Sequence, residues 1–159
     1  MHWRPYLSCF GFSLGLLLSS GLFAETITDV EVDFRDAASL VRLSEYFSET
    51  REERAVVRTD PEVRSGLYFI LELDSPHRDL PEGMTVELSL IVPESPEVVM
   101  HTLAFPKEEG NQRRAFLGLT GEAWPADPDR PQPTAWRVRL LDGAGQLLSE
   151  KSSFLWGSR

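Results

Sequence analysis

Two stretches decide the fold of this chain: Gly66-Leu-Tyr-Phe-Ile-Leu-Glu-Leu73 and Met84-Thr-Val-Glu-Leu-Ser-Leu-Ile-Val92. In each stretch every second residue is apolar, and a period of two residues is typical of a β-strand with one face in a core. The first stretch also has apolar residues on its second face, which favours a central, doubly covered strand. We therefore predict a central pair of strands with a core formed by Leu67, Phe69, Leu71, Val86, Leu88 and Leu90.

Further segments of extended composition occur on both sides of this pair, separated by turn residues. Counting the central pair, the predicted strands begin near Ile27, Ala55, Gly66, Met84, Val98, Arg113, Ala135 and Leu147. About eight short strands at this spacing predict an all-β fold, an immunoglobulin-like antiparallel β-sandwich, with a partly open barrel as the alternative. The segment 36–47 fits a short helix or an irregular loop.

The N-terminal residues 1–24 have the pattern of a signal peptide. Arg4 precedes an apolar run from Leu7 to Leu18, and Ala24 is followed by the acidic Glu25. This order is typical of a cleavable secretory leader, whereas a membrane-spanning helix needs about 20 apolar residues in succession. We expect residues 25–159 to form a single exported domain, periplasmic or extracellular, with no membrane span after cleavage. An uncleaved anchor helix is the alternative.

Charge and cysteine content exclude several classes of function. The formal net charge is −9, and an acidic surface repels the phosphate backbone, so we expect no nucleic-acid partner. The single cysteine, Cys9, lies within the predicted leader. The exported domain would therefore lack thiol catalysis, disulfides and cysteine metal sites.

Several short sequence segments resemble those of a family of small exported bacterial domains of unknown function. They are Val57-Arg-Thr59, Arg64-Ser-Gly-Leu-Tyr-Phe69, Leu80-Pro-Glu-Gly83, Pro93, the strand around Trp136, and Gly145-Gln-Leu-Leu-Ser-Glu-Lys-Ser-Ser-Phe154. The resemblance implies an immunoglobulin-like sandwich behind a leader. It implies no catalytic residues.

The loop between the two central strands is a weak candidate for a metal site. Asp74, His77, Asp79 and Glu82 supply the nitrogen and oxygen ligands that zinc or calcium prefers. No established metal-binding spacing is present, however, and Pro76, Pro81 and Gly83 account for the segment as an ordinary turn. We expect no metal and no cofactor.

Catalysis has little support in the sequence. Gly11-Phe-Ser-Leu-Gly15 matches a nucleophile elbow in letters, but Ser13 lies in the predicted leader. A general base must lie within hydrogen-bond reach of a nucleophile, and the sequence places neither His77 nor His101 near one. We interpret His77 as an exposed loop residue and His101 as a partly packed strand residue.

Two aromatic residues are candidates for binding. Trp124 lies in the proline-rich segment 121–133, and Tyr68 faces away from the predicted core. An exposed pair of rings could stack on a sugar or anchor a protein. The alternative is that Trp124 folds back and caps the end of the sandwich. Trp136, Phe154 and Trp156 are expected in the core.

The sequence therefore favours a non-enzymatic interaction or accessory domain of the bacterial envelope. Its partner would be another envelope or secreted protein, contacted through loops or a sheet edge. A carbohydrate-binding module that uses Trp124 and Tyr68 is the second hypothesis, and a hydrolase that uses His77 or His101 is the third.

Overall fold

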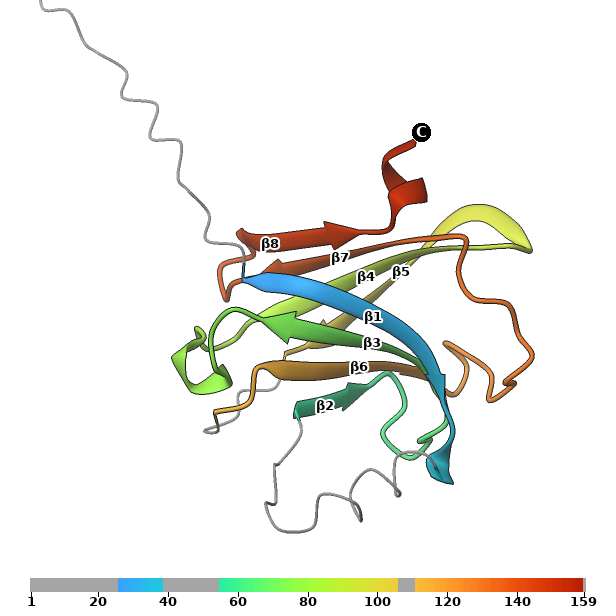
Figure 1. The fold of residues 1–159 in the computed structure, drawn as a ribbon, viewed down its shortest axis with the longest axis horizontal. Helices are drawn as coiled ribbons and strands as arrows, with labels where there is room; N and C mark the ends of the chain where they lie inside the picture. The colour runs from blue at the N-terminus through green and yellow to red at the C-terminus, as the bar shows by residue number, and fades with distance from the viewer. Residues whose placement is uncertain (1–25, 39–54, 106–110, 159) are drawn as a thin grey trace, which may run out of the picture.

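The computed structural model describes residues 26–38, 55–105 and 111–158, which form two β-sheets packed face to face (Figure 1). The predicted leader, residues 1–24, lies outside the described residues. So does most of the segment 36–47, although residues 37 and 38 are helical and the Ala37 amide donates a hydrogen bond to Ser65 Oγ at 3.1 Å.

The first sheet, sheet A, has four strands in the order β1-β3-β6-β2. Strand β3 pairs antiparallel with both β1 and β6, whereas β2 pairs with β6 in parallel. The strands are β1 (Ile27–Arg35), β2 (Ala55–Arg58), β3 (Gly66–Leu73) and β6 (Arg114–Thr120).

The second sheet, sheet B, has the order β5-β4-β7-β8, and all its neighbours are antiparallel. Its strands are β4 (Thr85–Val92), β5 (Ser95–Ala104), β7 (Ala135–Leu141) and β8 (Leu147–Ser152). Two short 3₁₀ turns complete the described elements, η1 (His77–Asp79) and η2 (Phe154–Ser158). The all-β class is thus confirmed, with eight strands in the described part of the chain.

The two central strands of the sequence are not neighbours in one sheet. Strand β3 is central in sheet A and β4 is central in sheet B, so the segment 74–83 crosses from one sheet to the other. With η1 and two prolines, this segment is too long and irregular for a tight hairpin turn. The prediction of a wholly antiparallel sandwich is also wrong at β2, which is parallel to β6.

The core lies between the two sheets and contains the predicted residues. Leu67, Phe69 and Leu71 of β3 face Val86, Leu88 and Leu90 of β4 in one buried cluster. On the outer face of sheet A a second, smaller cluster contains Tyr68, Ile70 and Phe116. The apolar residues on both faces of β3 therefore reflect its central position.

Phe154 and Trp156, which the sequence placed in the core, come after the end of the last strand. Strand β8 stops at Ser152, and η2 follows it away from the sandwich (Figure 1). Trp136 packs against the core, with its ring at an edge-to-face centroid distance of 5.9 Å from Phe69. Phe154, in contrast, is 89% exposed, so its predicted place in the core is wrong. Trp156 lies against Arg137, whose guanidinium carbon is 4.9 Å from the centre of the indole ring.

Candidate functional site

The loop that the sequence marked for metal binding holds a buried histidine instead. His77, the first residue of η1, is fully buried. Its ring stacks on that of Phe105, with the two ring centroids 5.3 Å apart. Its Nε2 atom lies 3.1 Å from the carbonyl oxygen of Arg114, and its amide donates to the carbonyl of Gln112 at 3.0 Å. His77 therefore attaches the loop to the start of β6, and the prediction of an exposed histidine is wrong.

The carboxylates of the same loop do not converge on this histidine. Asp74 and Asp79 are exposed, and Asp79 makes an ion pair with Arg78 at 3.5 Å. In the residues that the structure describes, no group of three histidine, cysteine or acidic side chains could hold a metal ion. The weak metal candidate formed by Asp74, His77 and Asp79 is therefore not assembled.

The two candidate binding aromatics are both buried. Trp124 is 2% exposed and belongs to the main core, and the Arg130 guanidinium carbon lies 4.5 Å from its ring centre. The loop after β6 thus folds back and closes one end of the sandwich. Arg130 also approaches Glu94, at 4.0 Å, in the turn between β4 and β5.

Tyr68 faces the outer side of sheet A, as predicted, but its ring has no exposed surface. Its hydroxyl donates to the Arg64 carbonyl at 2.7 Å and accepts from Arg58 Nε at 2.9 Å. Burial of both rings excludes a shared exposed platform, so the hypothesis of a stacking surface at Trp124 and Tyr68 is wrong. The alternative, in which Trp124 folds back and caps the end of the sandwich, is confirmed.

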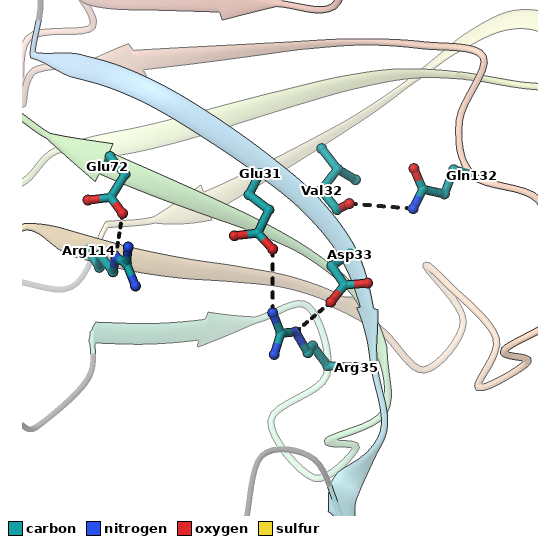
Figure 2. Close-up of polar contacts among 7 residues, drawn as sticks. All are labelled: Glu31, Val32, Asp33, Arg35, Glu72, Arg114 and Gln132. Atoms are coloured by element: carbon teal, nitrogen blue, oxygen red, sulfur yellow. Dashed lines mark hydrogen bonds and ion pairs between the residues drawn. The ribbon is translucent and has the colours of Figure 1, made fainter. Parts of the chain in front are cut away.

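Arginines pair with several carboxylates on the outer face of sheet A (Figure 2). Arg35 binds Asp33 at 2.9 Å and Glu31 at 3.6 Å along β1, and Arg114 of β6 binds Glu72 of β3. The Gln132 side chain donates to the Val32 carbonyl at 3.4 Å, which connects the proline-rich loop to β1. These carboxylates act as members of ion pairs on a solvated face.

The second candidate base, His101, is half-buried on β5, which confirms a partly packed strand histidine. Burial lowers the pKa of its imidazole below 6.5, because desolvation disfavours the charged form. Its Nε2 atom is buried and has no hydrogen-bond partner in the described part of the chain. No described serine or carboxylate is therefore paired with this nitrogen for acid–base chemistry.

The edges of the two sheets differ in how they are protected from pairing with another strand. An exposed edge presents free backbone groups, and proteins block such edges with charges, prolines or short strands. Strand β2 has four residues, β1 carries Asp29, Glu31 and Asp33, and β8 carries Glu150 and Lys151. Strand β5 has ten residues, and its charge and proline lie only at its start, in Pro96 and Glu97.

Hydrogen bonding within sheet B determines which backbone groups of β5 point outward. The amide of Phe105 donates to the Met84 carbonyl at 2.9 Å, and the register pairs His101 with Leu88 and Val99 with Leu90. Antiparallel pairs alternate between bonded and non-bonded residues, so Val99, His101 and Leu103 are bonded to β4. The N–H and C=O groups of the intervening residues point to the free edge. These residues are Val98, Met100, Thr102 and Ala104.

We call this row of four residues the β5 edge. Across the ranges that the structure describes, its outward backbone groups have no hydrogen-bond partner. Met100 is 61% exposed and Val98 is 48% exposed, and both side chains lie on the outer face of sheet B. Their neighbour Val99 is also exposed. The β5 edge therefore combines free backbone groups with exposed apolar side chains.

Sequence reasoning placed the start of a strand near Val98 but missed this surface. A signal was present, because Val98-Val-Met100 puts apolar residues on both faces and breaks the alternation. The run from Val98 to Ala104 also contains no Asp, Glu, Lys or Arg. What the sequence could not show was that β5 lies at an edge, which depends on the strand order.

Comparison with protein-family models, with curated proteins and with solved structures gave no match. In residues 26–38, 55–105 and 111–158, no helix has the length and apolar character required to cross a membrane.

Proposed function

We propose that this chain is a non-enzymatic accessory domain, exported to the bacterial envelope, that binds another exported protein at the β5 edge. The bound segment would add a strand next to β5, with main-chain hydrogen bonds supplying affinity and alternate side chains supplying specificity. The observation that carries the proposal is the row of free backbone groups at Val98, Met100 and Thr102, flanked by exposed apolar side chains.

The immunoglobulin-like class is part of this proposal, and the strand order supports it. If β1, β3 and β6 are strands A, B and E, and β4, β5, β7 and β8 are strands C, C′, F and G, the orders A-B-E and C′-C-F-G follow. Strand β2 then occupies the position beside E that strand D holds in such domains, but it comes earlier in the chain and is parallel to its neighbour.

Export is supported by the composition of residues 1–24. Cell fractionation followed by mass spectrometry of the N-terminus tests it. We expect the protein in the periplasmic or extracellular fraction with residues 1–24 removed. A cytoplasmic protein that retains its first residues would contradict this part of the proposal.

Partner binding can be tested in living cells by site-specific photo-crosslinking. A photoreactive residue at Met100 is compared with one at Leu147, an exposed residue on β8, the opposite edge strand of sheet B. We expect a discrete cross-linked protein at position 100 and none at position 147. A Val98→Lys substitution should abolish that product, because it places a charge beside the added strand.

Two results would contradict the proposal. One is the absence of any cross-linked partner at position 100, and the other is the same set of products at positions 100 and 147. Because Val98 and Leu147 are both exposed, Leu147→Lys serves as the matched control for the effect of an added charge.

A further inference from the structure

Two arginines of β7, Arg137 and Arg139, lie on the outer face of sheet B, and only Arg139 is balanced by acidic side chains. The register places Arg139 between Glu87 of β4 and Glu150 of β8. Its guanidinium binds both carboxylates, at 2.8 Å and 3.5 Å. Arg139 therefore shows how this face holds an arginine whose charge is neutralised within the chain.

Arg137 has the equivalent place two residues earlier, but its neighbours carry hydroxyl groups instead of carboxylates. The register places it between Ser89 of β4 and Ser152 of β8. Across the ranges that the structure describes, the Arg137 side chain makes no hydrogen bond and no ion pair, and its Nε atom is buried without an acceptor. The positive charge of Arg137 is therefore left unbalanced in the described part of the chain.

The indole of Trp156 holds the Arg137 guanidinium in place. The guanidinium carbon lies 4.9 Å from the centre of the ring. The segment that carries Trp156 is attached to β7, because the Ser153 amide donates to the Trp136 carbonyl at 2.9 Å. A guanidinium that stacks through its face keeps its terminal N–H groups for a planar, bidentate partner such as a carboxylate.

The surroundings of Arg137 favour an acidic segment of a protein over a small anion. Small ligands are usually enclosed in clefts, whereas Arg137 lies on the outer face of a sheet. The turn η2 also presents Phe154 and Leu155, which are exposed, and Met100 lies in the same row of the sheet beyond Ser89. A matching ligand therefore carries a carboxylate between apolar groups.

We infer that Arg137 binds an Asp or Glu side chain of another protein, in a segment where apolar residues flank the acid. This contact rests on the proposed binding of an exported protein, but it does not require strand addition at β5. Because β7 is two strands from β5, about 10 Å away, one partner can contact both places.

The overall acidity of the chain sets the strength of this contact. A net charge of −9 repels an acidic segment at long range, and physiological salt screens that repulsion beyond about 8 Å. The attraction to Arg137 acts only at contact. A short peptide should therefore bind weakly, with a dissociation constant on the order of 1 mM.

NMR of the arginine side-chain N–H groups in the purified chain measures binding at Arg137 separately from the β5 edge. The chain is titrated with the capped tripeptide Leu-Glu-Leu, with capped Leu-Gln-Leu as the uncharged control and sodium acetate as the free carboxylate. We expect the Arg137 signals to shift with Leu-Glu-Leu, more weakly with acetate, and not with Leu-Gln-Leu. The Arg139 signals should not move, because Glu87 and Glu150 already occupy its guanidinium.

A carboxylate supplied within the chain should close the site. Ser152→Glu places an acid beside Arg137, as Glu150 lies beside Arg139, and should weaken Leu-Glu-Leu binding at least about tenfold. Ser152→Gln is the matched control and should bind as the wild type does. Arg137→Lys should also weaken binding, because lysine lacks the planar fork of the guanidinium. Position 152 is exposed, and circular dichroism of each variant confirms that the fold is retained.

Three results would overturn the inference. The first is an Arg137 signal that does not move with Leu-Glu-Leu, or that moves as much with Leu-Gln-Leu. The second is an equal affinity for acetate and Leu-Glu-Leu, which would assign the site to small acids. The third is a loss of binding in Ser152→Gln as large as that in Ser152→Glu. A failure of this kind would leave strand addition at the β5 edge untouched, because cross-linking at Met100 tests that edge independently.

Discussion

The two edge strands of sheet B, β8 and β5, differ in length, in charge and in how a strand of the other sheet contacts them. Strand β8 has six residues and carries Glu150, which binds Arg139 at 3.5 Å. At Ser149 it meets the start of β1, because the buried amide of Ile27 donates to Ser149 Oγ at 3.1 Å. Strand β5 is longer and uncharged over most of its length, and its outward backbone groups are free.

This difference shows that an edge is defined by what lies beside it as well as by its place in the sheet order. Sheet A reaches over the β8 side through Ile27, which is fully buried. On the opposite side, the edge strand of sheet A is the four-residue β2, and Val98, Val99 and Met100 of β5 stay exposed. The β5 side of the sandwich is therefore the open one, where we propose that a further strand binds.

The largest expected effect is a difference in the stability lost when a side chain is truncated on the β8 side and on the β5 side of the sandwich. Ile27→Ala removes a fully buried side chain on the β8 side and should lower the free energy of unfolding by about 2–5 kcal/mol. Val99→Ala on the open side should cost less than about 1 kcal/mol, because its side chain is already 41% exposed. Urea denaturation of dilute protein measures both. Equal losses would mean that the two sides are packed alike.

A smaller effect is expected for the hydrogen bond between β1 and β8. Ser149→Ala leaves the amide of Ile27 buried without its partner, which should cost about 1–3 kcal/mol. Ser152→Ala, at an exposed position of the same strand, is the matched control and should change stability by no more than about 0.5 kcal/mol. If both variants unfold at the same urea concentration as the wild type, the hydrogen bond between Ile27 and Ser149 does not stabilise the contact of β1 with β8.

The smallest expected effect concerns pH and β5. Because burial lowers the pKa of His101 below 6.5, the unfolded chain binds this proton more readily than the folded chain. The contribution to stability is therefore present above pH 6.5 and is lost as the pH falls through the lowered folded-state pKa.

His101→Gln should make stability less dependent on pH between roughly pH 7.5 and 5.5, a range in which ordinary carboxylates stay ionised. Thermal melting of the wild type and the variant at both pH values measures the difference. If the melting temperature of the variant changes with pH as much as that of the wild type, groups other than His101 cause the pH dependence.

The sequence predicted the strands and the core well, because alternation reports burial directly. Leu67 and Leu88 were placed in the core from the two-residue period of apolar residues alone, and both are buried there. The sequence could not predict that β3 and β4 lie in different sheets, because the same alternation suits a hairpin and an inter-sheet connection. Nor could it predict the parallel pairing of β2, which depends on contacts distant in the chain.

The candidate site was less predictable than the fold. Trp124 and His77 lie in segments rich in proline and charge, and such segments usually lie at the surface. Whether one large side chain folds inward depends on space at the end of the sandwich, which local sequence does not encode. The exposed Met100 shows the converse, because this apolar strand residue lies on a free edge that depends on the strand order.

Backbone hydrogen exchange of dilute, monomeric protein tests the open β5 edge most directly. Residues bonded to β4 should exchange slowly, and residues of the β5 edge should exchange fast, so protection should alternate along the strand. We predict slow amides at Val99, His101 and Leu103 and fast amides at Val98, Met100 and Thr102. Uniform protection of all six amides in the monomer would show that the edge is already covered and would contradict the account.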